Sequence, residues 1–584
     1  MAQKTFYNLT TDIPVDDIPF NRYPRPQLRR KEWINLNGRW ECGVNVPFPL
    51  QSVNSGFEGK VPEEYVYFRT FDLKIPKKGR RVLLHFGAVD QVCKVYVDDM
   101  YVGYHEGGYL PFCLDITDAL ADKLTHILKV DVTDTLSIIY PYGKQSNNRG
   151  GMWYTPVSGI WQTVWIEIVP EKYIKGIKIT PHLKGIELEV DSDNDDYKIE
   201  IFDADIYGPV SEDDRIPTGN KSKIIISKRA KGPYHKIEIP KPKLWDVDHP
   251  YLYGIRITSG EDTVESYFAL RRISIVKDKL HRRICLNRKP FFFHAVLDQG
   301  YYPEGIFLPN SERGYEEDIL NMKKLGFNSL RKHIKIEPAC FYEACDRIGM
   351  VVMQDMVNNS DYNFLRDTVF PTAKMKTLPD HFLHKDPESR AFFIKHMEDT
   401  VEYLYNFPCI CYYTIFNEGW GQFDSDKMYT LLKSHDKTRI VDSTSGWFTQ
   451  LKSDVWSRHV YFHPVSHMMH VRPIIVSEFG GYSYVEKGHT FNFGGNYAYK
   501  EFQSKAELSV GIKKMYERDI VPYISKGLCG AVLTQLSDVE DETNGVYTYD
   551  RKVLKFDPEI MDIIAREIKE EEKKISEGKN DKDI

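Results

Sequence analysis

Apolar and polar residues alternate along many short segments in the first half of the chain, and this pattern predicts β-strands. Turn residues separate the segments, with no amphipathic helical stretch between them. We therefore expect residues 1–170 to form a jelly-roll β-sandwich and residues 171–275 a second, immunoglobulin-like sandwich. The clearest expected strands are residues 81–86, 93–97, 126–132, 174–179, 198–201, 223–226 and 253–257.

The pattern changes after residue 275, where apolar strand-like runs alternate with helical stretches. Eight such runs predict a (β/α)₈ TIM barrel over residues 276–584. The expected strands are residues 291–297, 329–333, 350–353, 409–416, 439–442, 455–461, 473–477 and 530–535, with early helices at 316–325 and 337–348.

Two of these strands deliver a glutamate. The fourth runs into Asn417, Glu418 and Gly419, and the seventh into Ser477 and Glu478. The active sites of TIM barrels lie at the carboxyl ends of the strands, so we expect the two carboxylates to share one site. Two carboxylates presented in this way are the minimum equipment for cleaving a glycosidic bond.

Composition narrows the class of partner. With 584 residues the chain is expected to form two or three domains. It carries 78 Lys and Arg against 84 Asp and Glu, and no basic stripe suggests a nucleic-acid partner. The start lacks an apolar signal segment and no stretch has the length of a membrane helix, so a cytoplasmic protein without a membrane partner is expected. The 9 cysteines include no C-x-x-C pair, which favours reduced thiols.

Four ordered stretches resemble one known family. They are the Ser-Gly-Ile-Trp-Gln run at 158–162, the Leu-Trp to Pro-Tyr-Leu-Tyr stretch at 244–253, Asn-Glu-Gly at 417–419 and Ser-Glu-Phe-Gly at 477–480. Together they resemble glycoside hydrolase family 2, which contains β-galactosidases, β-glucuronidases and β-mannosidases. The resemblance implies that the jelly roll is a sugar-binding-like domain and the barrel the catalytic one.

The resemblance also implies a chemistry. Glu478 would be the nucleophile and Glu418 the acid/base of a retaining double displacement by an exo-glycosidase, with the two carboxyls ~5 Å apart. Asn417 would donate to the sugar 2-hydroxyl. A catalytic role for both glutamates competes with a structural one, since buried acids are normally paired.

Other residues at the strand ends are candidates for substrate binding. For His459 and Tyr461 the family often has an H-x-Y arrangement near the sugar, whereas a structural hydrogen bond at a strand end is the alternative. Trp447 and Trp420 are either platforms for a sugar ring or core residues. Four further candidates are either contacts for hydroxyl groups or supporting structure: Arg331, His333, Asp298 and Asp355.

No metal and no cofactor are expected. His463, His467 and His470 have a spacing that a helix could turn into a ligand face. Pro464 and the lack of a nearby acid argue against that interpretation. Hydrolysis by two carboxylates requires no cofactor.

The identity of the sugar is inferred by exclusion. Family glucuronidases carry an N-x-K motif after the eighth strand that contacts the sugar carboxylate, and here Val546 stands in place of the lysine. A neutral terminal sugar is therefore expected, because burying an unpaired uronate is costly. The resemblance favours a β-galactosidase-like specificity, since galactose is the commonest neutral sugar of the family. β-Glucuronidase, α-L-arabinofuranosidase, β-mannosidase and glucosaminidase activities stay open, as do endo action, a non-catalytic carbohydrate-binding role and a homo-oligomer.

Overall fold

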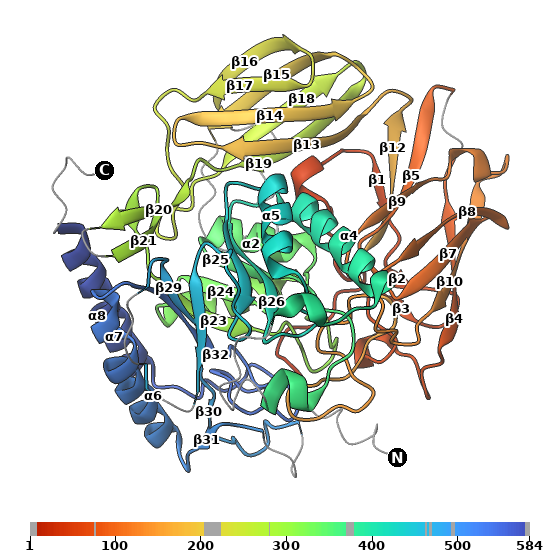
Figure 1. Ribbon diagram of the computed structural model, residues 1–584. Helices are drawn as coiled ribbons and strands as arrows, with labels where there is room; N and C mark the ends of the chain where they lie inside the picture. The colour runs from red at the N-terminus through yellow and green to blue at the C-terminus, as the bar shows by residue number, and fades with distance from the viewer. Residues whose placement is uncertain are drawn as a thin grey trace.

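The computed structural model describes residues 9–74, 78–203, 223–278, 281–369, 379–461, 464–465, 470–491 and 497–577. Two β-sandwiches precede a barrel of parallel strands, so the predicted fold class is confirmed. In Figure 1 the first sandwich is red to orange, the second is yellow at the top, and the barrel runs from green to blue. None of the described helices is long and apolar enough to cross a membrane.

The first sandwich consists of two four-stranded antiparallel sheets, ordered β1-β12-β5-β9 and β4-β10-β7-β8. Strand β10 illustrates the sequence rule, since His126, Leu128, Val130 and Val132 are buried while most of their neighbours are not. Its strands are β1 Trp33–Asn35, β2 Gly38–Arg39, β3 Asn45–Val46, β4 Glu64–Asp72, β5 Arg80–Phe86, β6 Val89–Asp90, β7 Val92–Val97, β8 Met100–Glu106, β9 Phe112–Asp115, β10 Thr125–Thr133, β11 Gly159–Ile160 and β12 Val164–Pro170.

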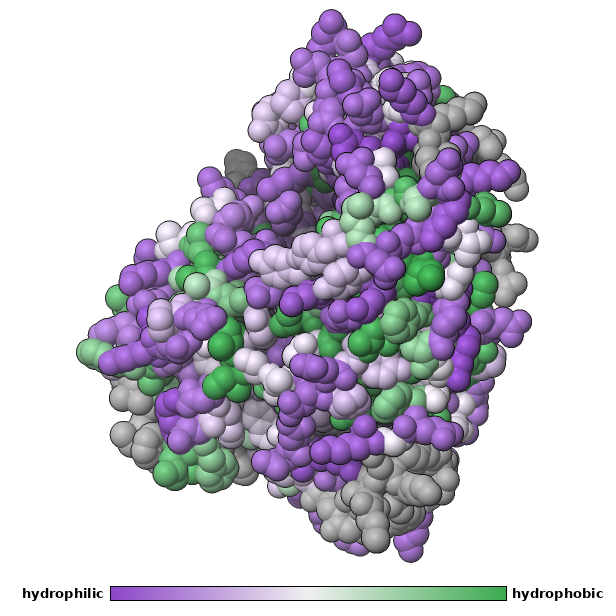
Figure 2. Space-filling view, turned by 90° about the vertical axis from the view of Figure 1, so that its right-hand side faces the viewer, coloured by the Kyte–Doolittle hydropathy of each residue, from purple (hydrophilic) through white to green (hydrophobic). Residues whose placement is uncertain are grey.

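The second sandwich pairs a three-stranded sheet, β13-β14-β17, with a four-stranded sheet, β16-β15-β18-β19. The side seen in Figure 2 is mainly hydrophilic over this domain, at the top of the view. Its strands are β13 Ile174–Pro181, β14 Gly185–Ser192, β15 Asp196–Asp203, β16 Lys223–Lys231, β17 Tyr234–Glu238, β18 Tyr253–Ser259 and β19 Asp262–Phe268.

The barrel has eight parallel strands in the order β27-β26-β25-β24-β23-β32-β29-β28. Nearly every residue of these strands is buried, because side chains fill the inside and helices cover the outside. The strands are β23 Phe293–Asp298, β24 Ser329–Lys332, β25 Val351–Asp355, β26 Ile410–Asn417, β27 Ile440–Ser445, β28 Trp456–Val460, β29 Ile474–Gly480 and β32 Leu528–Thr534. The described α-helices are α1 Glu312–Lys324, α2 Ala339–Ile348, α4 Pro387–Leu404, α5 Ser425–His435, α6 Lys505–Asp519, α7 Val521–Ile524 and α8 Pro558–Glu577.

Shorter strands lie beside the barrel: β20 Ile273–Asp278, β21 His281–Leu286, β22 Lys289–Pro290, β30 Tyr482–Ser483 and β31 Lys500–Glu501. Several element boundaries differ from those expected, and two of them have a clear local cause. Helix α1 begins four residues before the predicted start, and its first turn contains Gly314, which packs closely against Pro309. Strand β27 extends to Ser445 through a buried polar run that hydrophobicity alone does not mark as strand.

Arg30 ties the two sandwiches together. Its guanidinium donates to Glu167 of β12 at 2.9 Å and to both oxygens of Asp262 of β19 at 3.1 and 2.9 Å. All three side chains are almost fully buried. Removing one partner of such a network leaves uncompensated charge inside the protein, which is strongly destabilising.

We therefore expect Arg30→Met to destabilise the protein by roughly 3–5 kcal/mol. Arg81→Met is the matched control, because its ion pair with Asp115 is exposed and should be worth less than about 1 kcal/mol. Thermal and urea unfolding of the two variants measure the difference. Equal shifts would show that the buried network contributes no more than a surface pair.

Candidate active site

Glu418 and Glu478 are placed at the carboxyl end of the barrel by β26 and β29, the fourth and seventh of its strands. Glu418 directly follows β26 with a left-handed backbone, φ +52°, and Gly419 follows with φ +78°. A Cβ on Gly419 would lie 2.4 Å from the Phe448 ring, so this turn requires glycine. Left-handed backbone at a non-glycine residue is uncommon and clusters at functional sites.

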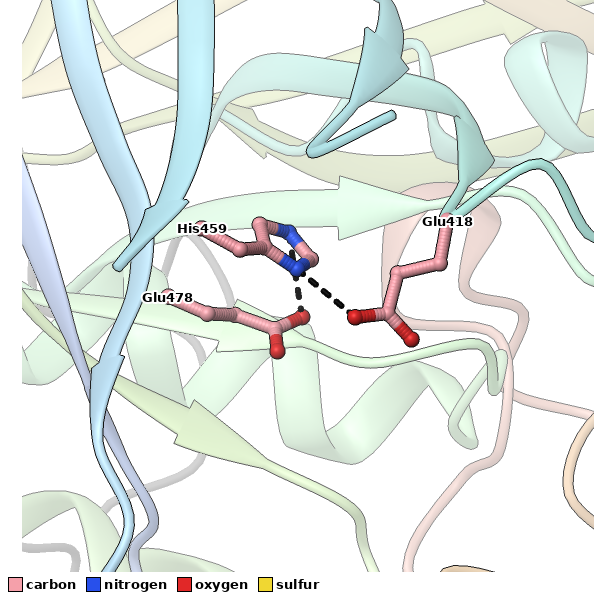
Figure 3. A group of neighbouring side chains, drawn as sticks. All are labelled: Glu418, His459 and Glu478. Carbon is pink, nitrogen blue, oxygen red and sulfur yellow. Dashed lines mark hydrogen bonds and ion pairs between the residues drawn. The ribbon is translucent and has the colours of Figure 1, made fainter. Parts of the chain in front are cut away.

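His459 lies between the two carboxylates (Figure 3). Its Nδ1 is 2.8 Å from Oε1 of Glu418, and its Nε2 is 3.5 Å from Oε1 of Glu478 and 3.0 Å from the Ser445 hydroxyl. The ligand-type atoms of Glu418, His459 and Glu478 all lie within 4.8 Å of one another. The two glutamates, 60 positions apart in sequence, thus share one small volume.

Arg331 donates hydrogen bonds to several residues of this cluster. This fully buried residue of β24 donates to Oε1 of Glu478 at 2.9 Å, to Oδ1 of Asn417 at 2.8 Å and to the Ser477 carbonyl at 2.9 Å. It is also paired with Asp355 of β25 at 3.0 Å. One planar guanidinium therefore fixes side chains from three other strands, a task suited to its forked donors.

Glu478 is held as a carboxylate. Burial alone would raise its pKa, but the charges of His459 and Arg331 together lower the pKa from 4.5 to about 2. Tyr461 adds a hydrogen bond by donating to Oε2 at 2.6 Å. Burial raises the pKa of Tyr461 well above its ordinary value, so this hydroxyl keeps its proton. A carboxylate that is ionised at neutral pH is the form a nucleophile needs.

Asn417 is oriented with a spare donor. Its Oδ1 accepts from Arg331, and its Nδ2 is buried without a hydrogen-bond partner. Buried amide nitrogens are normally satisfied, so this one is free for a bound molecule. Arg331 donates to both Asn417 and Glu478, which places the amide close to the Glu478 carboxylate.

The other predicted residues divide into two groups. His333 at 2.7 Å from Asp355 and Trp447 with its ring 5.5 Å from that of His459 extend the central cluster. Asp298 instead pairs with Lys332 at 2.8 Å and accepts from the Gly300 amide at 2.9 Å, so its carboxylate is occupied by supporting structure.

Several residues near the cluster were not predicted. Ser445 of β27 contacts His459, and Thr534 of β32 lies 3.0 Å from the Tyr461 hydroxyl. A loop of the first sandwich contributes Trp153, which stacks on Trp420 at 5.4 Å, and Lys144, whose ammonium lies 5.5 Å from the Trp420 ring. The Gly-Gly-Met-Trp run at 150–153 was the available signal, since it adjoins the sandwich motif.

The two carboxylates and the imidazole are also the group of described residues that could hold a metal ion. In the structure, however, Arg331 donates to Glu478 and supplies positive charge at that oxygen. His459 is already engaged by Glu418 through one nitrogen and by Ser445 through the other. Of the histidines set aside as metal ligands, His463 and His467 lie outside the described residues.

Sequence comparison matches the three domains to three related families. Residues 25–164 match the sugar binding domain of glycosyl hydrolases family 2, residues 172–271 match glycosyl hydrolases family 2, and residues 276–541 match the TIM barrel domain of that family. The chain therefore belongs to glycosyl hydrolases family 2, as the sequence motifs predicted.

Individual relatives are distant. The chain is 26% identical over 304 residues to a β-galactosidase of Thermoanaerobacter pseudethanolicus, covering 50% of this chain and 39% of that protein. It is 24% identical over 428 residues to a β-galactosidase of Pseudoalteromonas haloplanktis, covering 71% and 38%. The structure of a β-D-glucuronidase from Dictyoglomus thermophilum is similar with a TM-score of 0.71 at 16% identity, covering 94% of this chain and 98% of that one. The chain thus spans about two-fifths of the length of these two galactosidases.

The depressed pKa of Glu478 has a measurable consequence for stability. A carboxylate whose pKa falls on folding stabilises the protein above its ordinary pKa, and that contribution is lost as the pH drops through the folded value. The advantage of the wild type over Glu478→Gln in free energy of unfolding should therefore shrink between pH 4.5 and about 2. Urea unfolding across this range measures it.

Glu58→Gln, at an exposed position, is the control for the general effect of removing one acid. A difference between wild type and Glu478→Gln that stays constant down to pH 2 would contradict the assigned ionisation.

Proposed function

We propose that the protein is a retaining exo-glycosidase that cleaves a terminal β-linked sugar. The observation that carries the proposal is the closeness of the Glu418 and Glu478 carboxylates, whose nearest oxygens lie within 4.8 Å. Retaining glycosidases hold their carboxyls about 5–5.5 Å apart, whereas inverting enzymes leave about 6.5–9.5 Å for a water molecule. Family membership supports the same class of reaction.

In the first step the Glu478 carboxylate forms a bond to the anomeric carbon as the bond to the leaving oxygen breaks. Glu418, protonated, gives its proton to that oxygen. Arg331 and Tyr461 each donate to Glu478, so they fix the direction of its oxygens while moderating its charge. The product of this step is a glycosyl ester of Glu478 and the free alcohol.

In the second step Glu418, now a carboxylate, takes a proton from water. The resulting hydroxide oxygen attacks the anomeric carbon and releases Glu478, which returns the site to its starting state. His459 contacts Glu418 through Nδ1 and is itself anchored by Ser445, so it holds the acid/base in position through both steps. Asn417 would donate to the 2-hydroxyl, a bond that strengthens in the transition state.

The observations that bear on the sugar favour two candidates. Val546, in place of the glucuronidase lysine, is fully buried, and nearby Lys555 is neutralised by Asp538 at 2.6 Å. These features favour a neutral sugar, and the names of the galactosidase relatives favour galactose. Lys144 favours a second candidate, an acidic sugar, because it brings positive charge from another domain to the same end of the barrel.

Substitution of the two glutamates tests the reaction. Glu478→Gln should lower hydrolysis of every aryl glycoside by more than about 10³-fold, because the covalent step is lost. Glu418→Gln should lose about 10²–10⁴-fold on leaving groups that need protonation and far less on dinitrophenyl glycosides that do not. A panel of nitrophenyl and dinitrophenyl glycosides gives both values.

The stereochemistry of the first product, followed by proton NMR, completes this test. Retention of the β configuration is expected. An α product, or full activity in Glu478→Gln, would overturn the proposed mechanism.

Asn417 offers a separate test. Asn417→Ala should reduce kcat/KM about 10- to 100-fold on the normal glycoside, because one donor to the transition state is lost. The matched control is the 2-deoxy glycoside, which lacks the hydroxyl, so the same substitution should cost much less there. Equal losses on both substrates would show that Asn417 acts only through Arg331.

A further inference from the structure

Lys144 belongs to a rigid loop of the first sandwich that is seated on the barrel. The Tyr142 amide donates to the Asn358 carbonyl at 3.0 Å and the Tyr142 hydroxyl to the Ser360 carbonyl at 2.7 Å. Gly143 fits so closely that an added Cβ would lie 2.8 Å from the Ile334 carbonyl. The position of the Lys144 backbone is therefore fixed relative to the ends of β24 and β25.

The side chain of Lys144 is enclosed by aromatic rings. The residue is 7% exposed, and its ammonium lies 5.6 Å from the Tyr154 ring and 5.5 Å from the Trp420 ring. Trp420 is two residues beyond Glu418, and Trp153 stacks on it. The charge thus stands against Trp420 and acts on His333, a member of the central cluster, rather than lying at the outer surface.

Among the described residues no carboxylate pairs with this ammonium, which lies near the two rings and whose charge helps to lower the pKa of His333. Glu542, the acid that contacts Tyr154, is bound by the Tyr154 hydroxyl and by the Asn544 amide. Cation–π contacts offset only part of the cost of removing an ammonium from water. A buried lysine without an anion is costly, and a ligand that supplies the anion removes that cost.

We propose that Lys144 is a specificity-determining residue that selects glycosides carrying a negatively charged group, a carboxylate or a sulfate ester, on the sugar. This inference rests on the proposed glycosidase function and names the substrate class for the same site. The first sandwich then supplies the cation that the loop after β32 lacks at Val546.

The charge and the enclosure together favour an anion over a neutral hydroxyl. A hydroxyl accepts one hydrogen bond from an ammonium but leaves its charge uncompensated. A carboxylate or sulfate forms a charge-assisted bond, which is roughly twice as strong as a neutral one. The low exposure of Lys144 also limits screening of that attraction by salt.

The test compares wild type, Lys144→Met and Lys144→Arg on four nitrophenyl β-glycosides: the galactoside, the galacturonide, the glucuronide and the 6-sulfogalactoside. The measured quantity is the ratio of kcat/KM on each acidic substrate to that on the galactoside. We expect wild type to favour at least one acidic substrate, and Lys144→Met to lower that ratio about 10- to 100-fold. Lys144→Arg, which keeps the charge, should recover part of it.

Lys172→Met, at an exposed position in the second sandwich, is the control and should leave the ratio unchanged. The acidic substrate that is preferred identifies the anion as carboxylate or sulfate. Thermal unfolding of each variant checks that the protein is folded and that the loop still packs against the barrel.

The two proposals fail in different ways. If Glu478→Gln retains full activity, or wild type cleaves no glycoside, the glycosidase function itself is overturned. A second outcome is that wild type cleaves the galactoside best and Lys144→Met keeps every ratio of acidic-substrate to galactoside kcat/KM within threefold of the wild-type ratio. In that case the glycosidase function stands and the proposed role of Lys144 is wrong. A uniform loss on all four substrates would assign Lys144 to supporting the loop, which also overturns the inference.

Discussion

The site depends on the compensation of one buried charge. Arg331 has no contact with solvent, so its guanidinium must be neutralised and its donors satisfied inside the barrel. Asp355 and Glu478 supply the charge, and Asn417 and the Ser477 carbonyl complete the hydrogen bonds. The requirement that stabilises Arg331 therefore also fixes the ionised state of Glu478 and the direction of the Asn417 amide.

The second carboxylate is controlled by different means. Among the described residues Glu418 has no arginine partner, and it is contacted by His459, which the Ser445 hydroxyl anchors from the neighbouring strand. Its backbone is left-handed, so the side chain leaves the end of β26 in a direction that a regular strand does not offer. Two glutamates with the same covalent structure thus receive distinct surroundings, which is the usual basis for assigning them different roles.

Much of the architecture could be predicted, because its signals are local. Apolar and polar residues alternate within the strands of the sandwiches, and after residue 275 strands alternate with helices. The positions of Glu418 and Glu478 could also be predicted, since a strand that ends at a glutamate followed by glycine carries its own marker. Positions at strand ends, and for His459 and Tyr461 the family's H-x-Y arrangement, brought Arg331, His459 and Tyr461 into consideration, but not their partners. Which strand end meets which depends on barrel closure, a property of contacts far apart in sequence.

The site residues that could not be predicted from the sequence are polar residues within polar segments or residues of another domain. Ser445 lies in a run of buried serine and threonine that hydrophobicity does not distinguish from a loop. Asp298 looked like a site residue, yet Lys332 takes its charge. Lys144 is 274 positions from Glu418, and the Gly-Gly-Met-Trp run that follows it marks a turn without indicating which barrel strands the loop contacts.

The way this loop is seated has a consequence for how such proteins diverge. Its hydrogen bonds to residues 358–360 of the barrel are made by the amide and hydroxyl of Tyr142, by the Gly143 amide and by the carbonyls of residues 138 and 139, so none of them uses the side chain at position 144. A single codon change there alters the chemistry beside the reacting sugar and leaves the support of the loop intact. The barrel residues can then stay the same in a lineage while substitutions in the first sandwich change which substrates are accepted. Selectivity and bond cleavage can therefore evolve separately.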